Sequence, residues 1–180
     1  GGTVKAGGED LTGMKEKDLA ALRLRRLGFV FQNPHLLRTL CLLDNIALPG
    51  FLAGDRPREE VVARARGLME SMGISGLESS DVAEVSGGQL QRASICRALI
   101  NDPEIVIGDE PTGALNSSSA AQVLDIMGDI RARGTTVVLV THDPMVAVRA
   151  DRVLVLVDGK ITDDVALGRY SPDAAAERTA

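Results

Sequence analysis

The sequence predicts an α/β fold built on a mostly parallel β-sheet. Short apolar runs rich in β-branched residues occur at 27–31, 104–108, 135–140 and 151–161, and helical patterns separate them. Strands that alternate with helices favour a parallel sheet that is buried on both faces. Ligands bind such sheets at the carboxyl ends of the strands, so we expect the functional residues there.

Length and composition indicate one globular domain, or most of one. The chain has 180 residues, 44% of them hydrophobic, which is enough to bury a core. A net charge of −5, with three Phe, one Tyr and no Trp, argues against a nucleic-acid surface. No apolar run approaches the roughly 18 residues of a membrane span, so we expect a soluble chain. Cys41 and Cys96 lie in apolar surroundings and are interpreted as structural thiols of a reducing compartment.

The amino-terminal part of the chain predicts a hairpin, a short helix and a strand. Residues 1–13 alternate like a hairpin, with Gly7 and Gly8 at its turn. The pattern over 17–26 is typical of a helix, and it leads directly into the apolar run at 27–31.

Residues 33–85 have a helical texture. One helix is expected over 42–54 and a second over 55–73, with Asp55 near its cap and Pro57 in its first turn. The second helix has an apolar face expected to pack in the core, made of Val61, Ala65, Leu68, Met69 and Met72.

Polar side chains follow three of the predicted strands. Asp109 and Glu110 follow one strand, His142 another and Gln32 a third. At such an edge one carboxylate can hold Mg²⁺ through water, while its neighbour can polarise an attacking water. Each of these residues alone would be an ordinary surface residue, but together they indicate a chemical site.

Residues 85–92, VSGGQLQR, predict an anion-binding turn at the start of a helix. Gly87 and Gly88 remove side chains from the turn, so the first backbone N–H groups of the helix face outward. Such a helix start is suited to a phosphate group.

Taken together, these motifs resemble the ATP-binding cassette of ABC transporters. VSGGQLQR is similar to the signature sequence, IVIGDEP to the Walker B strand, FQNP to the Q-loop, GALN to the D-loop and VTHD to the H-loop, in the family's order. The resemblance implies a P-loop NTPase-like α/β fold with a helical subdomain, about 33–85, inserted between the Q-loop and the signature motif. The whole chain, 1–180, would be a partial cassette domain.

The resemblance also implies roles for the residues that follow the strands. Asp109 would coordinate Mg²⁺, and Glu110 would act as catalytic base. His142 would contact the γ-phosphate of ATP, and Gln32 would link the metal and the water to the helical subdomain.

The signature implies a second ATPase subunit. Ser86, Gly87, Gly88 and Gln89 would bind the γ-phosphate of a nucleotide held by that subunit, in a head-to-tail dimer. Asn116 stands where the D-loop commonly has Asp, and it is either a D-loop contact or the cap of the next helix.

Further partners follow from the same resemblance. The helical subdomain would meet transmembrane permease subunits at the cytoplasmic face of the membrane, and no nucleic-acid partner is expected. The texture is most similar to cassettes of the macrolide-export, lipoprotein-release and antimicrobial-peptide-resistance type, which favours export over import.

One motif of the family is absent from these 180 residues. The phosphate-cradling loop, G-x-x-x-x-G-K-[ST], does not occur, and the one Gly-Lys pair, Gly159-Lys160, follows a strand and precedes Ile161. We therefore expect that an amino-terminal segment with this loop is missing, and that the chain alone is inactive while its full-length parent is an ATPase.

Two other readings compete with a transporter ATPase. DNA-repair and chromosome-organising cassettes insert very long segments between Q-loop and signature, whereas 53 residues separate Gln32 from Ser86 here, which argues against them. A truncated or loop-less cassette that binds partners without hydrolysis is the remaining alternative. Glu110 and His142 are both present, so the sequence shows no loss of the catalytic chemistry itself.

Overall fold

The computed structural model describes residues 2–6 and 8–168, in two units, Gly1–Val140 and Thr141–Ala180. The first unit contains β1 to β5 and α1 to α5, and the second contains α6, β6 and β7. None of the helices within the described residues is both long and apolar enough to cross a membrane.

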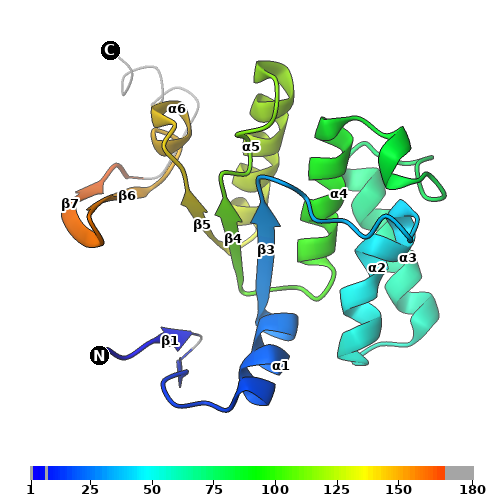
Figure 1. Ribbon diagram of the computed structural model, residues 1–180, viewed down its shortest axis with the longest axis horizontal. Coiled ribbons are helices and arrows are strands. Elements are labelled where there is room, and N and C mark those ends of the chain that lie inside the picture. Colours follow the sequence, from blue (N-terminus) through cyan, green and yellow to red (C-terminus); the bar gives the residue numbers. More distant parts are fainter. Residues whose placement is uncertain (1, 7, 169–180) are drawn as a thin grey trace. The chain divides into compact units, whose positions relative to one another are not determined.

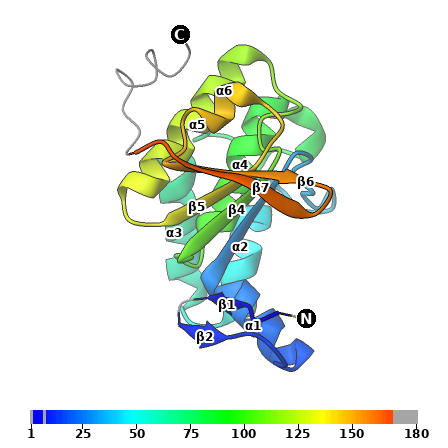
Figure 2. The same cartoon turned by 90° about the vertical axis from the view of Figure 1, so that its left-hand side faces the viewer.

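The first unit begins with the predicted hairpin and helix. Strands β1 (Lys5–Ala6) and β2 (Glu9–Asp10) pair antiparallel, which confirms the hairpin; Gly7 of its expected turn lies outside the described residues. The hairpin lies beside α1 (Glu16–Arg26) in both views (Figure 1 and Figure 2). Arg26 at the end of α1 pairs with Glu9 at 3.3 Å and with Glu104 at 2.6 Å, and so links the hairpin to the start of β4.

Three strands form the predicted parallel sheet, in the order β3-β4-β5. The strands are β3 (Leu27–Phe31), β4 (Ile105–Asp109) and β5 (Thr136–Val140). Phe31, Asp109 and Val140 lie opposite one another in the register, so the carboxyl ends of all three strands are level. The prediction of a parallel sheet with its functional edge at these ends is therefore confirmed for three strands.

One face of this sheet is covered by helices α4 (Gly87–Leu99) and α5 (Ser117–Ala132). Val30 and Val106 are fully buried there, packed against Ile95, Val123, Met127 and Ile130. On the opposite face Val138 is 46% exposed and Val140 56% exposed. The expectation of a sheet buried on both faces is thus wrong for the described residues, because α4 and α5 both pack on the same face.

The helical region forms a second core together with α4. Helices α2 (Leu42–Ala53) and α3 (Arg58–Ser71) and the short 3₁₀ helix η1 (Val82–Glu84) stand with α4 on one side of β3 (Figure 1). Their buried core includes Leu42, Ile46, Val61, Ala65, Met69, Ala93, Cys96 and Ile100. The predicted apolar face of α3 is therefore confirmed, while the subdomain boundary at 33–85 stays a prediction.

The start of α3 differs from the prediction. Pro57 occupies the cap position, and no side chain caps the helix. Asp55 instead accepts a hydrogen bond of 2.8 Å from Arg25 of α1. The Asp55 carboxylate, which the sequence pattern placed near the start of α3, therefore forms an ion pair with α1.

The second unit contains α6 (Pro144–Ala147) and an antiparallel hairpin of β6 (Arg152–Val157) and β7 (Lys160–Ala166). The sequence pattern placed the run at 151–161 among the strands of the parallel sheet, and this is wrong: β6 pairs with β7. Asp158 and Gly159, with φ of 51° and 73°, make the two-residue turn that suits hairpins, so the chain reverses at once.

Candidate functional site

Asp109 and Glu110 lie at the carboxyl end of the central strand. Asp109 is the last residue of β4 and is exposed. Glu110 is half-buried, and its backbone N–H donates to the Val140 carbonyl at 2.9 Å. Its φ of 46° lies in the left-handed region, which costs free energy for a residue with a side chain and recurs at functional sites. The neighbouring strand thus holds Glu110 in a conformation that the chain would otherwise avoid.

Gln32 lies at the same edge. It directly follows Phe31, which is opposite Asp109 in the register. Its side chain packs against the turn after Glu110: a Cβ placed on Gly113 would lie 2.8 Å from Gln32 Nε2. The absence of a side chain at Gly113 is therefore what leaves room for the Gln32 amide.

The backbone on both sides of Gln32 is hydrogen-bonded to α4. Gln91 Nε2 donates to the Phe31 carbonyl at 3.0 Å, and the Gln91 side chain is buried. Arg97 donates to the Pro34 carbonyl at 2.7 Å and to the His35 carbonyl at 2.8 Å. Burial lowers the pKa of the Arg97 guanidinium. The His35 ring contacts the Phe31 ring edge to face, at 5.6 Å between centroids, so this loop folds back on itself.

Ser86 is the cap of α4, the helix that carries the predicted anion-binding turn. Its Oγ accepts a hydrogen bond from the Gln89 N–H at 3.4 Å, and its own N–H donates to Gln89 Oε1 at 2.8 Å. This reciprocal capping box fixes the turn before any ligand binds. Ser86 and Gly87 are exposed, whereas Gly88 and Gln89 are half-buried. The accessible part of this turn is therefore the cap residue Ser86 and the first residue of α4, Gly87.

The start of α5 packs directly against this turn. Asn116 Oδ1 accepts a hydrogen bond from the Ser119 N–H at 2.9 Å, so the helix-cap reading of Asn116 is confirmed. A Cβ on Gly88 would lie 2.9 Å from Ser119 Oγ. The two helix starts therefore form one packed corner.

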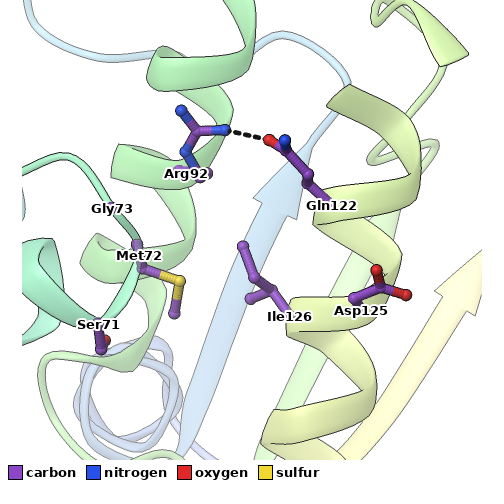
Figure 3. Close-up of a pocket in the computed structure, with 7 residues that line it drawn as sticks. All are labelled: Ser71, Met72, Gly73, Arg92, Gln122, Asp125 and Ile126. Atoms are coloured by element: carbon purple, nitrogen blue, oxygen red, sulfur yellow. Dashed lines mark hydrogen bonds between the residues drawn. The ribbon is translucent and has the colours of Figure 1, made fainter. Parts of the chain in front are cut away.

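A second contact joins the same two helices. Arg92 of α4 donates to Gln122 Oε1 of α5 at 2.7 Å (Figure 3). The pair lines a cavity of about 410 Å³, which is also lined by Met72, the residue after α3. Among the described residues, the buried Arg92 Nε has no hydrogen-bond partner. This link, like the Gly88 contact, sets the position of α4 relative to α5.

His142 lies in the second unit, two residues after the end of β5. Of the residues predicted to meet at the sheet edge, the structure brings Gln32, Asp109 and Glu110 together within the first unit. The expected meeting of His142 with them stays a prediction.

The residues at the edge fit a magnesium ion bound together with a polyphosphate. Asp109 and Gln32 offer carboxylate and amide oxygens at an exposed position. Mg²⁺ takes oxygen ligands and commonly uses one or two carboxylates, with water and phosphate completing the shell. Within residues 2–6 and 8–168, no three His, Cys, Asp or Glu residues are grouped closely enough to hold a metal by themselves.

Sequence reasoning missed the residues that support Gln32. Gln91 and Arg97 contact a loop 60 or more positions away, and no local periodicity reports such a contact. Gly113 is the one residue of this group that the sequence could have indicated, because a glycine beside a predicted site permits close approach of another group.

The family relationship is decided by a sequence model described as "ABC transporter", which matches residues 1–113. The chain belongs to the ABC transporter family. The matched segment of this cassette includes Gln32, the signature at 85–92, Asp109 and Glu110.

Curated relatives of the cassette include export proteins. It is 42% identical over 163 residues to the "Macrolide export ATP-binding/permease protein MacB" of Mannheimia succiniciproducens, covering 91% of this chain and 25% of that protein. It is 42% identical over 179 residues to the MacB protein of Rhodopseudomonas palustris, covering 99% of this chain and 27% of that protein. The chain thus spans about a quarter of the length of these relatives.

A solved structure confirms the fold. The ATP-binding cassette MJ0796, described as dimeric in a post-hydrolysis state with ADP and Pi, matches with a TM-score of 0.84 and 31% identity. The match covers 94% of this chain and 75% of that chain. The P-loop NTPase-like α/β cassette fold predicted from the sequence is therefore confirmed.

Proposed function

We propose that this cassette binds and hydrolyses ATP in the full-length protein and thereby powers transport through membrane permease subunits. The observation that carries the proposal is the edge of the sheet, where Glu110 is held in a left-handed conformation directly after Asp109 and beside Gln32. A carboxylate pair and an amide at one edge supply a ligand for Mg²⁺ and a base for water.

Each residue at this edge of the sheet has its own role. Asp109 and Gln32 bind Mg²⁺, which when bound neutralises charge on the phosphates. Glu110 accepts hydrogen-bond donation from the attacking water and takes its proton. His142, from the segment after β5, contacts the γ-phosphate.

The exposed start of α4 serves a second ATPase subunit. Ser86 and Gly87 are exposed at the start of α4, and helix N-termini stabilise anions. With Gly88 and Gln89 behind them, they bind the γ-phosphate of a nucleotide held mainly by the other subunit of a head-to-tail dimer. The description of MJ0796 as dimeric supports this arrangement. Asn116, the cap of α5, stabilises the adjacent corner and contacts the same nucleotide.

Export is the direction of transport that the relatives favour. Both named relatives are described as macrolide export proteins that combine ATP-binding and permease functions. The cassette then lies at the cytoplasmic face of the membrane, where its helical region meets the permease part.

Mixing two defective subunits of the full-length protein tests this proposal. Gly87→Asp places a carboxylate where the partner's phosphate would lie, and Glu110→Gln removes the base. In a head-to-tail dimer of the two, one site carries both defects and the other carries neither. Each variant alone should lose ATP turnover by ~10²-fold or more, and the mixture should recover part of it.

Two outcomes of the mixing experiment would contradict the proposal. A mixture as inactive as its parents would mean that each signature serves its own subunit's nucleotide. Normal turnover in the separate variants would remove both residues from the site, whereas a full-length wild type without any turnover would favour the non-hydrolysing alternative. As a control for the mixing step itself, two separate preparations of Gly87→Asp are mixed with each other and their ATP turnover is measured.

A further inference from the structure

The loop at residues 31–35, which contains the Q-loop motif FQNP, is hydrogen-bonded to the helix that carries the signature. Hydrogen bonds from α4 reach the loop on both sides of Gln32: Gln91 binds the carbonyl before it, and Arg97 binds two carbonyls after it. Helix α4 stands directly beside β3 (Figure 1). The loop backbone is therefore fixed by the same helix whose first turn is offered to the partner's nucleotide.

The Gln32 side chain itself is held from the other direction. Its amide lies in the space that Gly113 leaves, in the turn that follows Glu110. That turn leads to the Asn116 cap of α5, which packs against Gly88 of the signature. Gln32 is thus exposed to solvent, with its neighbouring backbone held by α4 and its amide held against the turn at Gly113.

We propose that Arg97 and Gln91 are positioning residues that, with Gly113, place the Gln32 amide at the sheet edge and make its position follow that of α4. The inference rests on the proposed function, because it assigns to these residues the placement of a group that acts in ATP hydrolysis. Arg97 touches neither nucleotide nor metal here and acts only through the loop.

The positioning role of Arg97 follows from the geometry of its hydrogen-bond donors. A guanidinium supplies several N–H donors in one plane, and Arg97 uses two of its nitrogens on consecutive carbonyls, so the loop cannot shift without breaking both bonds. A lysine carries its three donors on one flexible nitrogen, so it lacks the planar fork with which Arg97 spans the two carbonyls. A displacement of about 1 Å in a positioned group can lower turnover ~10²-fold.

A double-mutant cycle in the full-length protein tests the proposal. Arg97→Met and Gln32→Ala are measured alone and combined, for kcat and for KM of ATP. We expect Arg97→Met to lower kcat ~10-fold or more with KM changed less than ~3-fold, and to have no further effect when Gln32 is already Ala. Arg97→Lys should restore only part of kcat.

Two further variants separate positioning from folding. Arg64 of α3 also donates to two consecutive carbonyls of the α4 end, Leu99 and Ile100, so Arg64→Met is a matched control that should leave kcat unchanged. Gly113→Ala should fold, because the added methyl meets only the flexible end of Gln32, yet it should lower kcat as Arg97→Met does. If Arg97→Met fails to fold, Gly113→Ala carries the cycle with Gln32→Ala.

The possible results separate a failure of the positioning role from a failure of the ATPase assignment. Full additivity of the Arg97 or Gly113 change with Gln32→Ala would overturn the positioning role and leave the ATPase assignment standing. A normal kcat in Gln32→Ala alone would overturn the assigned role of Gln32 and, with it, the inference. An equal loss of kcat in Arg64→Met would show that any loosening of α4 has the same effect, which also overturns the inference.

Discussion

Gly88 in the signature and Ser119 in α5 touch so closely that no carbon atom fits between them: a Cβ on Gly88 would lie 2.9 Å from Ser119 Oγ and 3.2 Å from Ser119 Cβ. Glycine at this position is therefore a packing requirement between the two helix starts. The proposed anion-binding role of the turn gives a second and separate reason for it.

We predict that Gly88→Ala destabilises the protein by about 1–3 kcal/mol, the usual effect of overpacking a tight contact. Thermal or denaturant unfolding measures this. Ser119→Gly removes the obstructing atoms, so the pair Gly88→Ala with Ser119→Gly should lose less stability than the two single changes summed. Strict additivity would show that the two residues do not compete for space.

Asn45 fastens the loop that leads into α2. It is buried; its Oδ1 accepts from the Leu37 N–H at 2.7 Å, and its Nδ2 donates at 3.0 Å to the carbonyls of Leu37, Leu40 and Cys41. Asn45→Ala should cost about 1–3 kcal/mol, because it leaves buried polar groups without partners. Asn45→Asp should cost more, since it turns a carboxylate toward carbonyl oxygens. Thr39→Ala, in the exposed part of the same loop, is the control, and equal melting temperatures for Thr39→Ala and Asn45→Ala would refute this account.

The Asn45 loop shows what sequence patterns can and cannot supply. Local periodicity predicted the three strands of the parallel sheet, the apolar face of α3 and the helix over 42–54 nearly to the residue, because spacing along the chain fixes which side chains share a face. It placed Asp55 near a helix cap but did not show that an arginine 30 positions earlier in the chain binds its carboxylate. Contacts of that kind depend on the finished fold.

The residues of the candidate site were likewise predicted from the sequence only in part. Motif spacing located Gln32, the signature and the Asp109–Glu110 pair, since each lies where a strand ends or a helix begins. It could not show that Arg97 and Gln91 hold the Q-loop, nor that Gly113 leaves room for Gln32, because these depend on how α4 packs beside β3. The antiparallel β7 was also missed, since its exposed, mixed sequence lacks an apolar run.

We predict that Cys96 makes the free energy of unfolding decrease as pH rises in the alkaline range. Burial raises the pKa of its thiol from 9.0 to about 12. Between these values the unfolded thiol is ionised while the folded one keeps its proton, so unfolding releases a proton and becomes easier as pH rises. The free energy of unfolding should fall by about 1.4 kcal/mol per pH unit from this group.

Denaturant titrations at pH 8.5 to 10.5 measure the slope for Cys96. Cys96→Ala should be less stable at pH 8 because it leaves a small cavity, but its stability should decline less steeply with pH. Parallel curves for the two proteins would show that the buried thiol does not ionise on unfolding.

Residues 1–180 alone should bind Mg-ATP weakly. The segment contains Asp109 and Glu110 but no phosphate-cradling loop, so it turns negative charge toward a polyphosphate without a lysine and a full set of N–H groups to hold it. Calorimetric titration of this segment should give a Kd far above that of the full-length protein. Equal affinities would show that the segment supplies the complete nucleotide site.

The central claim is that Glu110 acts as the base in ATP hydrolysis, and Glu110→Gln in the full-length protein tests it most directly. Single-turnover hydrolysis and bound ATP are measured together, with the exposed Glu70→Gln as the matched control. The account predicts that Glu110→Gln binds ATP as the wild type does while hydrolysis slows ~10²–10⁴-fold, so that ATP stays bound to a dimer. Hydrolysis by Glu110→Gln at the rate of Glu70→Gln would contradict it.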